Sequence, residues 1–313
     1  MRTMKIVYMG TPDFAVGALR ALMENGYGVC GVVTQPDKPK GRGKTMVPTP
    51  VKEEAMRWGI PVYQPRKVRE PEFLEEMEAV APDLIVVAAF GQIIPKRLLD
   101  LPKYGCINIH ASLLPKYRGA APIQQAILDG EQETGVTLMR MDEGLDTGDI
   151  ITRVVVPIDR EETGGSLFDK LSLAGAQLLV QTLPSIADGT AVFEKQPAES
   201  PTPYARMITK QMGLMDFTKS AQELERLVRG LNPWPSAYTF LNGRTFKIWS
   251  CIPEEETGAE PGTVVRTGRE GILVACGAGS LCLTEVQLEG KKRMDADAFL
   301  RGYALKPGIR LGE

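Results

Sequence analysis

A single histidine, His110, occurs among the 313 residues, and it follows Asn108 by two positions in the stretch GCINIHASLLPKYRGAAP (105–122). If the run CINIH forms a strand, side chains two positions apart project from the same face, so the amide and the imidazole lie side by side. An amide can donate a hydrogen bond to an oxygen that becomes negative during a reaction, and an imidazole can exchange protons near neutral pH. The pair is therefore a candidate catalytic site, against the plainer interpretation that His110 is an ordinary core or surface histidine.

An imidazole in such a role usually needs a carboxylate that orients it and holds its charge. The stretch MDEGLDTGD (141–149), which follows the strand-like run VTLMR, is the best source of one. Its acidic residues are Asp142, Glu143, Asp146 and Asp149. Spacing alone does not choose among these four, and the same stretch could simply be a turn.

The elements that must position these residues alternate in type along the first half of the chain. Short β-branched runs predict buried strands over 5–9, 29–34, 84–90 and 106–109. Helical patterns lie over 13–26, 49–59, 70–82 and 165–189. This alternation predicts an α/β domain with a Rossmann-like, mostly parallel sheet. Ligands of such sheets bind at the carboxyl ends of the strands, which is where Asn108 and His110 stand.

The second half of the chain has a different pattern. Residues 190–207 lose periodicity and gather prolines and polar residues, which predicts a linker between domains 1–189 and 208–313. Beyond it, a helix over 221–231 precedes short strand-like runs with turns between them, including the hairpin signal LNGR. We therefore expect a small C-terminal β-barrel or sandwich.

Composition excludes several classes of protein. The net charge of −2 argues against a general affinity for nucleic acid, so any such binding needs a local patch. Five cysteines without a C-x-x-C pair, together with one histidine, indicate neither a disulfide framework nor a metal site. The amino terminus lacks a signal-peptide pattern and no apolar run approaches the length of a membrane span, so we expect a cytoplasmic protein without membrane contact. The stretch MGTPDFA lacks the second glycine of a dinucleotide fingerprint, which disfavours a nicotinamide or flavin enzyme.

Several long motifs together resemble the folate-dependent formyltransferases. They are NIHASLLPKYRGAAPIQQAI, GLDTGD, MGTPDFA (9–15), TQPDKPKGRGKTMVPTPVK (34–52), FGQIIP (90–95) and LNPWP (231–235). The resemblance covers nearly the whole chain and implies that Asn108, His110 and Asp146 form a catalytic trio. The implied reaction transfers a formyl group from 10-formyltetrahydrofolate to the α-amino group of methionine on initiator tRNA, without a metal. In it, Asn108 and a protonated His110 would stabilise the oxyanion, and Asp146 would help to relay the amine proton.

The resemblance also implies a folate site. Its residues would be Phe90, Gly91, Ile93, Ser112, Leu113, Leu114 and Pro115. In the same loop, Pro115 and Gly119 would fix a tight turn, and Lys116 and Arg118 could face an anionic group.

The tRNA contacts would come from a basic loop. Its cations are Lys38, Lys40, Arg42 and Lys44, against one acid, Asp37. Such loops are more often merely solvated, but long structureless loops are uncommon unless they are functional. The resemblance implies that this loop reaches the acceptor end of tRNA, chiefly through Arg42, and that residues 208–313 form an OB-like barrel touching the tRNA stem. There, KKR (291–293) is the candidate basic patch, and Trp234 is expected to pack in a core or between domains rather than to stack on a base.

Three alternatives remain open. A related enzyme could formylate an amino-sugar nucleotide, although so long a basic loop would have no use there. A non-catalytic RNA-binding module would not need the trio, and a dinucleotide oxidoreductase conflicts with the missing glycine. We expect a monomer whose partners are initiator methionyl-tRNA and the folate co-substrate.

Overall fold

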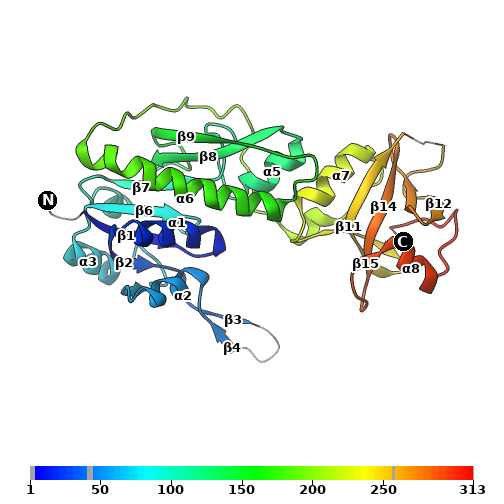
Figure 1. The fold of residues 1–313 in the computed structure, drawn as a ribbon, viewed down its shortest axis with the longest axis horizontal. Helices are drawn as coiled ribbons and strands as arrows, with labels where there is room; N and C mark the ends of the chain where they lie inside the picture. Colours follow the sequence, from blue (N-terminus) through cyan, green and yellow to red (C-terminus); the bar gives the residue numbers. More distant parts are fainter. Residues whose placement is uncertain (1–3, 41–44, 256–257, 313) are drawn as a thin grey trace. The chain divides into compact units, whose positions relative to one another are not determined.

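The computed structural model describes residues 4–40, 45–255 and 258–312. By contacts between residues, the chain divides into two units (Figure 1). The first comprises Met1–Pro122, Glu133–Pro157 and Phe168–Ala205. The second comprises Ile123–Gln132, Ile158–Leu167 and Arg206–Glu313, so two short segments that lie between parts of the first unit in the sequence belong to it.

A seven-stranded sheet forms the centre of the first unit. In spatial order its strands are β5 (Val62–Tyr63), β2 (Gly28–Val33), β1 (Lys5–Gly10), β6 (Leu84–Ala88), β7 (Cys106–His110), β8 (Glu133–Arg140) and β9 (Ile150–Pro157). The first five are parallel, and β8 and β9 are added antiparallel at one edge. Counted along the chain, the parallel strands have the order 3-2-1-4-5 of doubly wound α/β folds. The predicted Rossmann-like, mostly parallel sheet is confirmed.

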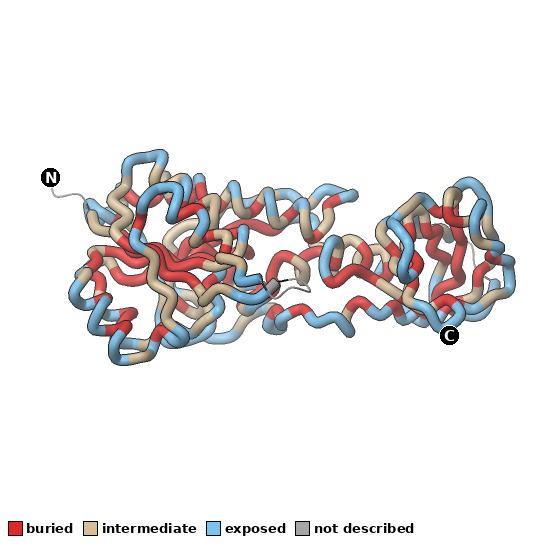
Figure 2. Tube along the Cα trace, turned by 90° about the horizontal axis from the view of Figure 1, so that it is seen from below, coloured by how far each residue is buried: buried red, intermediate tan, exposed pale blue. Residues whose placement is uncertain are grey.

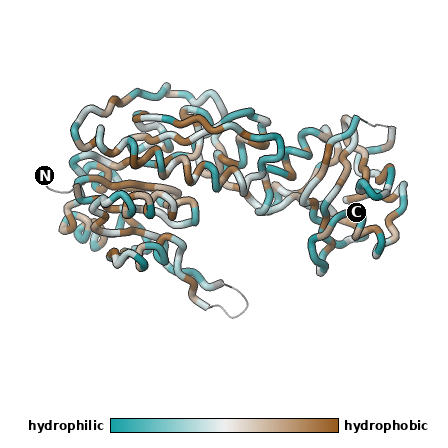
Figure 3. The backbone as a smooth tube through the Cα atoms, in the orientation of Figure 1, coloured by the Kyte–Doolittle hydropathy of each residue, from teal (hydrophilic) through white to brown (hydrophobic). Residues whose placement is uncertain are grey.

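The apolar runs of this sheet are buried because helices cover both of its faces. Every residue of β6 is buried, and Ile6 to Gly10 of β1 are buried as well. Figure 2 shows buried residues concentrated along the strands, and Figure 3 shows the same strands as largely hydrophobic. The sheet is therefore rigid where the chain leaves it, which is what a precise site requires.

The two helical layers differ in composition. One face packs against α3 (Pro71–Val80) and α4 (Lys96–Leu99), whose apolar residues form a cluster with Val7, Val87 and Cys106. On the other face lie α1 (Asp13–Glu24) and α6 (Gly164–Asp188), joined by an edge-to-face contact of Phe14 and Phe168 with ring centroids 5.5 Å apart. The remaining helices of the first half are α2 (Pro50–Arg57) and α5 (Pro122–Asp129).

The order of the strands creates a topological switch point beside β1. After β1 the chain runs to β2 and β5 on one side, and it then returns to β6 on the other. Neighbouring connections therefore diverge above the carboxyl ends of β1 and β6, which is where open α/β sheets bind ligands. The segments that leave β1, β6 and β7 meet at this edge, and β7 carries Asn108 and His110.

Two features of the first unit differ from the sequence-based expectations. The basic loop was expected to lack structure, but its two sides pair as an antiparallel hairpin of β3 (Lys38–Lys40) and β4 (Thr45–Val47). Strand β9, which pairs with β8 along its length, was not predicted, because only Ile150 of its eight residues is buried and the strand therefore lacks a buried apolar run.

The second unit is built on an antiparallel sheet, and most of α5 belongs to it as well. Its strands are, in spatial order, β10 (Ala237–Leu241), β11 (Arg244–Glu254), β14 (Ser280–Leu288), β13 (Gly271–Ala275) and β12 (Val264–Gly268), with β15 (Met294–Asp295) beside β14. Helix α7 (Ala221–Gly230) begins with a capping box of Ser220 and Glu223, and its Leu224 joins the core, as does Phe299 of α8 (Ala296–Gly302). A 3-10 turn, η1 (Lys210–Gly213), precedes them.

Two short signals of this unit had different outcomes. The LNGR hairpin is confirmed, because Asn242 and Gly243 both adopt positive φ (50° and 69°) between β10 and β11, as a tight hairpin turn requires. Trp234 is 55% exposed, so it does not lie in a core, and the other alternative, packing between domains, stays a prediction.

An ion pair between α1 and α2 yields a prediction on stability. Both carboxylate oxygens of the buried Glu54 accept hydrogen bonds from Arg20, each 2.9 Å long, and this holds the pKa of Glu54 below its ordinary value of 4.5. The stabilisation is therefore complete above that value and is lost as the pH falls through the lower pKa of the folded state. We expect Glu54→Gln to lower the free energy of unfolding by about 1–2 kcal/mol at neutral pH.

Urea unfolding at neutral and acidic pH measures the difference in the free energy of unfolding between wild type and variant. It should shrink as the pH falls below the pKa of an unfolded glutamate, because the wild-type carboxylate then loses its charge as well. The matched control is Glu53→Gln on the exposed side of the same helix. A pH-independent difference would contradict the ion-pair explanation.

Candidate active site

The register of β7 places Asn108 and His110 on one face of the sheet. Asn108 pairs with Val87 of β6 and Met139 of β8, and His110 pairs with Thr137 of β8. The residue between them, Ile109, points to the other face, where its side chain leaves no room for a Cβ on Gly175 of α6. The amide and the imidazole therefore share a face, as the spacing predicted, and His110 is only 6% exposed.

The nitrogens of His110 have different surroundings. Nε2 lies 3.0 Å from the carbonyl oxygen of Tyr117. A carbonyl oxygen can only accept a hydrogen bond, so Nε2 carries a proton and donates it. In the neutral ring Nδ1 is then the unprotonated nitrogen, and it is the one that can accept a proton.

Asp146 faces this second nitrogen. Its Oδ1 lies 3.7 Å from Nδ1 of His110, and its Oδ2 accepts a 2.8 Å hydrogen bond from the backbone N–H of Gly119. A distance of 3.7 Å is too long for a hydrogen bond, so the carboxylate acts on Nδ1 through its charge and leaves it free for another partner. Asp146 has a φ of 55°, a conformation that aspartate tolerates better than most residues.

The other acids of this loop face elsewhere. Oδ1 of Asp142 accepts hydrogen bonds from the backbone N–H of Gly144 and from the hydroxyl of Thr147, so Asp142 shapes the loop. Glu143 is exposed, and Asp149 contributes its backbone carbonyl to Arg140. Among the residues that the structure describes, only Asp146 is paired with His110.

The loop after β7 is held from inside, and this bears on the predicted folate residues within it. Ser112 is fully buried and its hydroxyl donates to the carbonyl of Lys116, while the hydroxyl of Thr137 links the carbonyl of Ser112 to the N–H of Leu114. Leu114 is buried, whereas Leu113 and Pro115 are partly exposed. Of the four, Leu113 and Pro115 therefore offer side-chain surface to a ligand.

The expectation that Arg118 faces an anionic group is wrong. Arg118 is 1% exposed, and its guanidinium donates to Gln196, Pro197 and Ala198. The segment Glu194–Ala205, expected as a linker, thus packs on the first unit beside the site. Sequence reasoning missed Gln196, because a stretch rich in proline and polar residues has the composition of a solvated linker.

The predicted residues after β6 lie at the switch point. Phe90 is buried, Gly91 has a φ of 81°, and Ile93 is 87% exposed. The carbonyl oxygen of Phe90 accepts hydrogen bonds from Thr11 and from the side chain of Gln35, both 3.2 Å, which ties this segment to the ends of β1 and β2.

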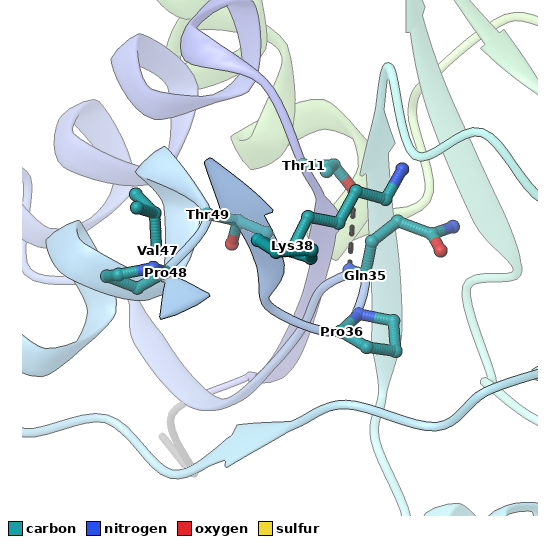
Figure 4. A pocket seen from close by; sticks show the side chains of 8 residues that line it. Thr11, Gln35, Pro36, Lys38, Val47, Pro48 and Thr49 are labelled. Carbon is teal, nitrogen blue, oxygen red and sulfur yellow. Dashed lines mark hydrogen bonds between the residues drawn. The ribbon is translucent and has the colours of Figure 1, made fainter. Parts of the chain in front are cut away.

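A cavity of about 250 Å³ opens next to the hydrogen bonds that Thr11 and Gln35 make with Phe90 (Figure 4). It is lined by Thr11, Gln35, Pro36, Lys38, Pro39, Val47, Pro48 and Thr49. Figure 4 shows Thr11, Gln35 and Lys38 gathered on one side of it, and Val47 and Pro48 on the other. The catalytic candidates do not line it, so it is a separate subsite along the same edge of the sheet.

The predicted tRNA contacts are described only in part. Lys38 is exposed at the cavity, while the side chain of Lys40 and the whole of Arg42 and Lys44 lie outside the described residues. Asp37 is paired with Lys52 at 2.7 Å and so does not neutralise Lys38, which forms no ion pair within the described part of the chain.

The basic triplet of the second unit is partly occupied. Arg293 forms an ion pair with Glu285 and lies over the ring of Trp249, 4.6 Å from its centroid. Lys291 and Lys292 remain exposed. The triplet therefore presents two cations beside a charge-compensated arginine.

One other potentially reactive group, the thiol of Cys106, lies near the site. Cys106 lies at the start of β7, and burial raises the pKa of its thiol to about 12, so it stays protonated and is a poor nucleophile. Within residues 4–40, 45–255 and 258–312, no cluster of three or more metal-ligating side chains occurs, and no helix is long and apolar enough to cross a membrane.

Comparison with known proteins connects this geometry to a family. The family model described as "Formyl transferase" matches residues 4–183, and that described as "Formyl transferase, C-terminal domain" matches residues 207–304. The methionyl-tRNA formyltransferase of Agathobacter rectalis is 56% identical over 306 residues, which is 97% of this chain and 98% of the relative.

Solved structures share the fold at lower identity. The sugar 3N-formyl transferase WlaRD, solved with dTDP and 5-N-formyl-THF, is 21% identical with a TM-score of 0.67, over 93% of this chain and 100% of that one. The N-formyltransferase of Helicobacter canadensis, solved with folinic acid and dTDP-3-aminofucose, is 22% identical with a TM-score of 0.66, over 90% and 99%. From the family models and the full-length relative together, the chain belongs to the formyl transferase family.

Proposed function

We propose that this enzyme transfers the formyl group of 10-formyltetrahydrofolate to the α-amino group of methionyl initiator tRNA. The observation that carries the proposal is the arrangement of His110, with Nε2 held by a carbonyl, Nδ1 facing Asp146, and Asn108 on the same face. The choice of acceptor rests on the relative's name together with its 56% identity over nearly the whole of both chains.

In this proposal, Asn108 and His110 stabilise the charge that develops on the formyl oxygen. The amine attacks the formyl carbon, a C–N bond forms, and the carbonyl oxygen becomes negative. The side-chain N–H of Asn108 and a protonated Nδ1 of His110 are the donors to that oxygen. Fixed donors of this kind contribute about 10²–10³-fold each to acyl transfer.

Asp146 completes the proton balance. The attacking amine loses one proton, and N10 of the folate must gain one when its bond to the formyl carbon breaks. A carboxylate 3.7 Å from Nδ1 stabilises the imidazolium and lies where it could receive the amine proton and return it to N10. No net proton is consumed, and the products are the formylated amine and tetrahydrofolate.

The segment after β6 suits packing against the face of a flat ring system such as the pterin of folate. Gly91, with its positive φ, turns the backbone there, and Ile93 offers an almost fully exposed apolar side chain. With Leu113 and Pro115 it would provide apolar contacts to the donor, which leaves the oxygen-stabilising groups to Asn108 and His110. Polar recognition of the pterin edge would then come from the backbone.

The cavity lined by Thr11, Gln35 and Lys38 suits a part of the acceptor tRNA that lies close to the reacting amine. Strands in a sheet are about 4.8 Å apart, so the ends of β1 and β2 lie about 10–15 Å from β7, roughly one nucleotide from the reacting amine. The cavity is smaller than the ~300 Å³ of a typical ligand pocket, so it would take only part of a substrate. Its cation and its apolar proline walls favour a nucleotide, and Lys40, a further predicted tRNA contact, belongs to the same strand as Lys38.

We expect Lys38→Ala to raise the KM for methionyl-tRNA several-fold with little change in kcat, because Lys38 binds phosphate without touching the reacting atoms. Removing one phosphate contact should also reduce the slope of log affinity against log salt by about 1. Steady-state kinetics at several salt concentrations measure both effects. Lys67→Ala, which removes an exposed lysine elsewhere on the unit, is the control, and equal KM values for the two variants would contradict this role.

The donor can be tested directly. Equal amounts of 10-formyl- and 5-formyltetrahydrofolate are offered with methionyl initiator tRNA, and formylmethionine is measured after hydrolysis of the tRNA ester. We expect product only with the 10-formyl donor, because the proposed proton return is to N10. Product from the 5-formyl compound alone would overturn the proposed donor.

The remaining roles follow from this function. We propose that residues 1–189 carry out the transfer and that residues 208–313 contact tRNA, with Lys291 and Lys292 as cations facing it. The enzyme would act as a monomer in the cytoplasm, where charged initiator tRNA is available.

A further inference from the structure

The segment Glu194–Ala205, here called the strap, is bound at one end to the first residue of β9, which follows the Asp146 loop, and at the other end to the loop after β7. At one end, Glu194 and Ile150 exchange two backbone hydrogen bonds of 2.8 Å. At the other end, the N–H of Ala205 donates to the carbonyl of Arg118, and the carbonyl of Ala205 accepts from Ala120 at 2.7 Å. The strap therefore has a fixed path across the site.

Both contacts of His110 depend on the strap. The N–H of Tyr117, whose carbonyl holds Nε2 of His110, donates to the hydroxyl oxygen of Thr202 at 2.7 Å. On the other side, the amide nitrogen of Gln196 donates to the carbonyls of Asp146 (3.0 Å) and Gly148 (2.7 Å). One segment thus sets the backbone on either side of the imidazole.

Gln196 is fully engaged, which fixes the orientation of its amide. Its oxygen accepts from two nitrogens of Arg118, at 3.0 and 3.3 Å, while its nitrogen reaches the two carbonyls of the Asp146 loop. A flipped amide would place an oxygen against two carbonyls and an NH₂ against a guanidinium, so only one orientation is satisfied.

Arg118 supplies the rigidity behind this amide. Its buried guanidinium also donates to the carbonyls of Pro197 (2.8 Å) and Ala198 (3.1 Å), and it has no carboxylate partner among the described residues. A buried charge must be met by hydrogen bonds, so the chain here cannot shift without leaving donors unpaired. Gly119 allows the close approach, since a Cβ on it would lie 2.6 Å from the carbonyl oxygen of Ala205.

We infer that Gln196 is a positioning residue for catalysis, which holds the Asp146 loop so that the carboxylate faces Nδ1 of His110. The inference rests on the proposed function, because it assigns Asp146 a part in the transfer. It gives one residue of the apparent linker, Gln196, a part in positioning the catalytic groups. Gln196 acts through Asp146 and need not touch either substrate.

The variant Gln196→Glu tests this with little change in shape. A glutamate still accepts from Arg118, and even provides it with a counter-charge, but it cannot donate to the carbonyls of Asp146 and Gly148. We expect kcat to fall about 10–100-fold with KM for donor and acceptor nearly unchanged, since a shift of about 1 Å in a catalytic group costs that much. Glu199→Gln, an exposed change in the same segment, should stay within about twofold of wild type.

The decisive readout is the effect of Gln196→Glu in an Asp146→Asn background, measured by single-turnover transfer of labelled formyl. If Gln196 acts only through Asp146, the double variant is no slower than Asp146→Asn alone. An equal loss in both backgrounds, or no loss in the wild-type background, would overturn the inference. Gln196→Met serves the same purpose if the glutamate variant does not fold. An inactive wild type would instead count against the proposed function, so the two failures are distinguishable.

Discussion

His110→Ala should lower kcat for formyl transfer by about 10³-fold, while binding of the formyl donor changes little. In the proposed mechanism, the variant removes one of the two donors to the developing oxyanion and also the group whose charge Asp146 stabilises. His110 is the only histidine in the chain, so no neighbouring imidazole can replace it. Single-turnover transfer of labelled formyl measures the chemical step, and equilibrium binding of the donor measures the rest.

A fold control is needed because His110 is buried. His110→Asn keeps a polar side chain of similar reach, and its unfolding transition should match that of wild type more closely than that of the alanine variant. Both variants should be much slower than wild type if the loss arises from chemistry, because an asparagine amide can donate a hydrogen bond but cannot carry the positive charge of an imidazolium. A turnover within about threefold of wild type in either variant would return His110 to the role of an ordinary buried histidine.

Asp146→Asn is expected to lower kcat by about 10²–10³-fold with an intact fold. The asparagine oxygen can still accept the hydrogen bond from Gly119, so the change removes mainly the negative charge opposite Nδ1 of His110. Without that charge the imidazolium is less stable, and the amine proton has no carboxylate to receive it. Single-turnover kinetics at saturating substrates measure the loss.

The matched control comes from the same loop. Asp142→Asn keeps an oxygen that can accept from Gly144 and Thr147, and Asp142 has no contact with His110 in the described structure. Its kcat should lie close to that of wild type. A larger loss for Asp142→Asn than for Asp146→Asn would mean that the wrong acid of the loop has been assigned.

The sheet and the pair on β7 were predictable because they depend on local patterns. Buried apolar runs mark the parallel strands, and the two-residue period alone places Asn108 and His110 on one face, where the register with β6 and β8 confirms them. The choice of Asp146 was not predictable from spacing. It depends on a loop in which Asp142 is engaged by its own neighbours and Asp146 adopts a left-handed backbone.

The strap could not be predicted for a different reason. Arg118 and Gln196 are 78 positions apart in the sequence. Arg118 also donates to the backbone carbonyl of Pro197, and every residue type has such a carbonyl, so these contacts leave no pattern in the sequence. A segment rich in proline and polar residues looks like a linker whether it is solvated or packed. The same limit explains the hairpin of β3 and β4, whose strands are only three residues each and mostly exposed.

The acceptor is the central claim, and one measurement tests it most directly. Labelled formyl from 10-formyltetrahydrofolate is offered to methionyl initiator tRNA, free methionine and an amino-sugar nucleotide in parallel reactions, with the uncharged tRNA as the blank. The structure and its relatives lead us to expect label on the charged tRNA alone. Label on the amino-sugar nucleotide, with none on the tRNA, would leave the roles of Asn108, His110 and Asp146 standing but contradict the assignment of the acceptor and of Lys38.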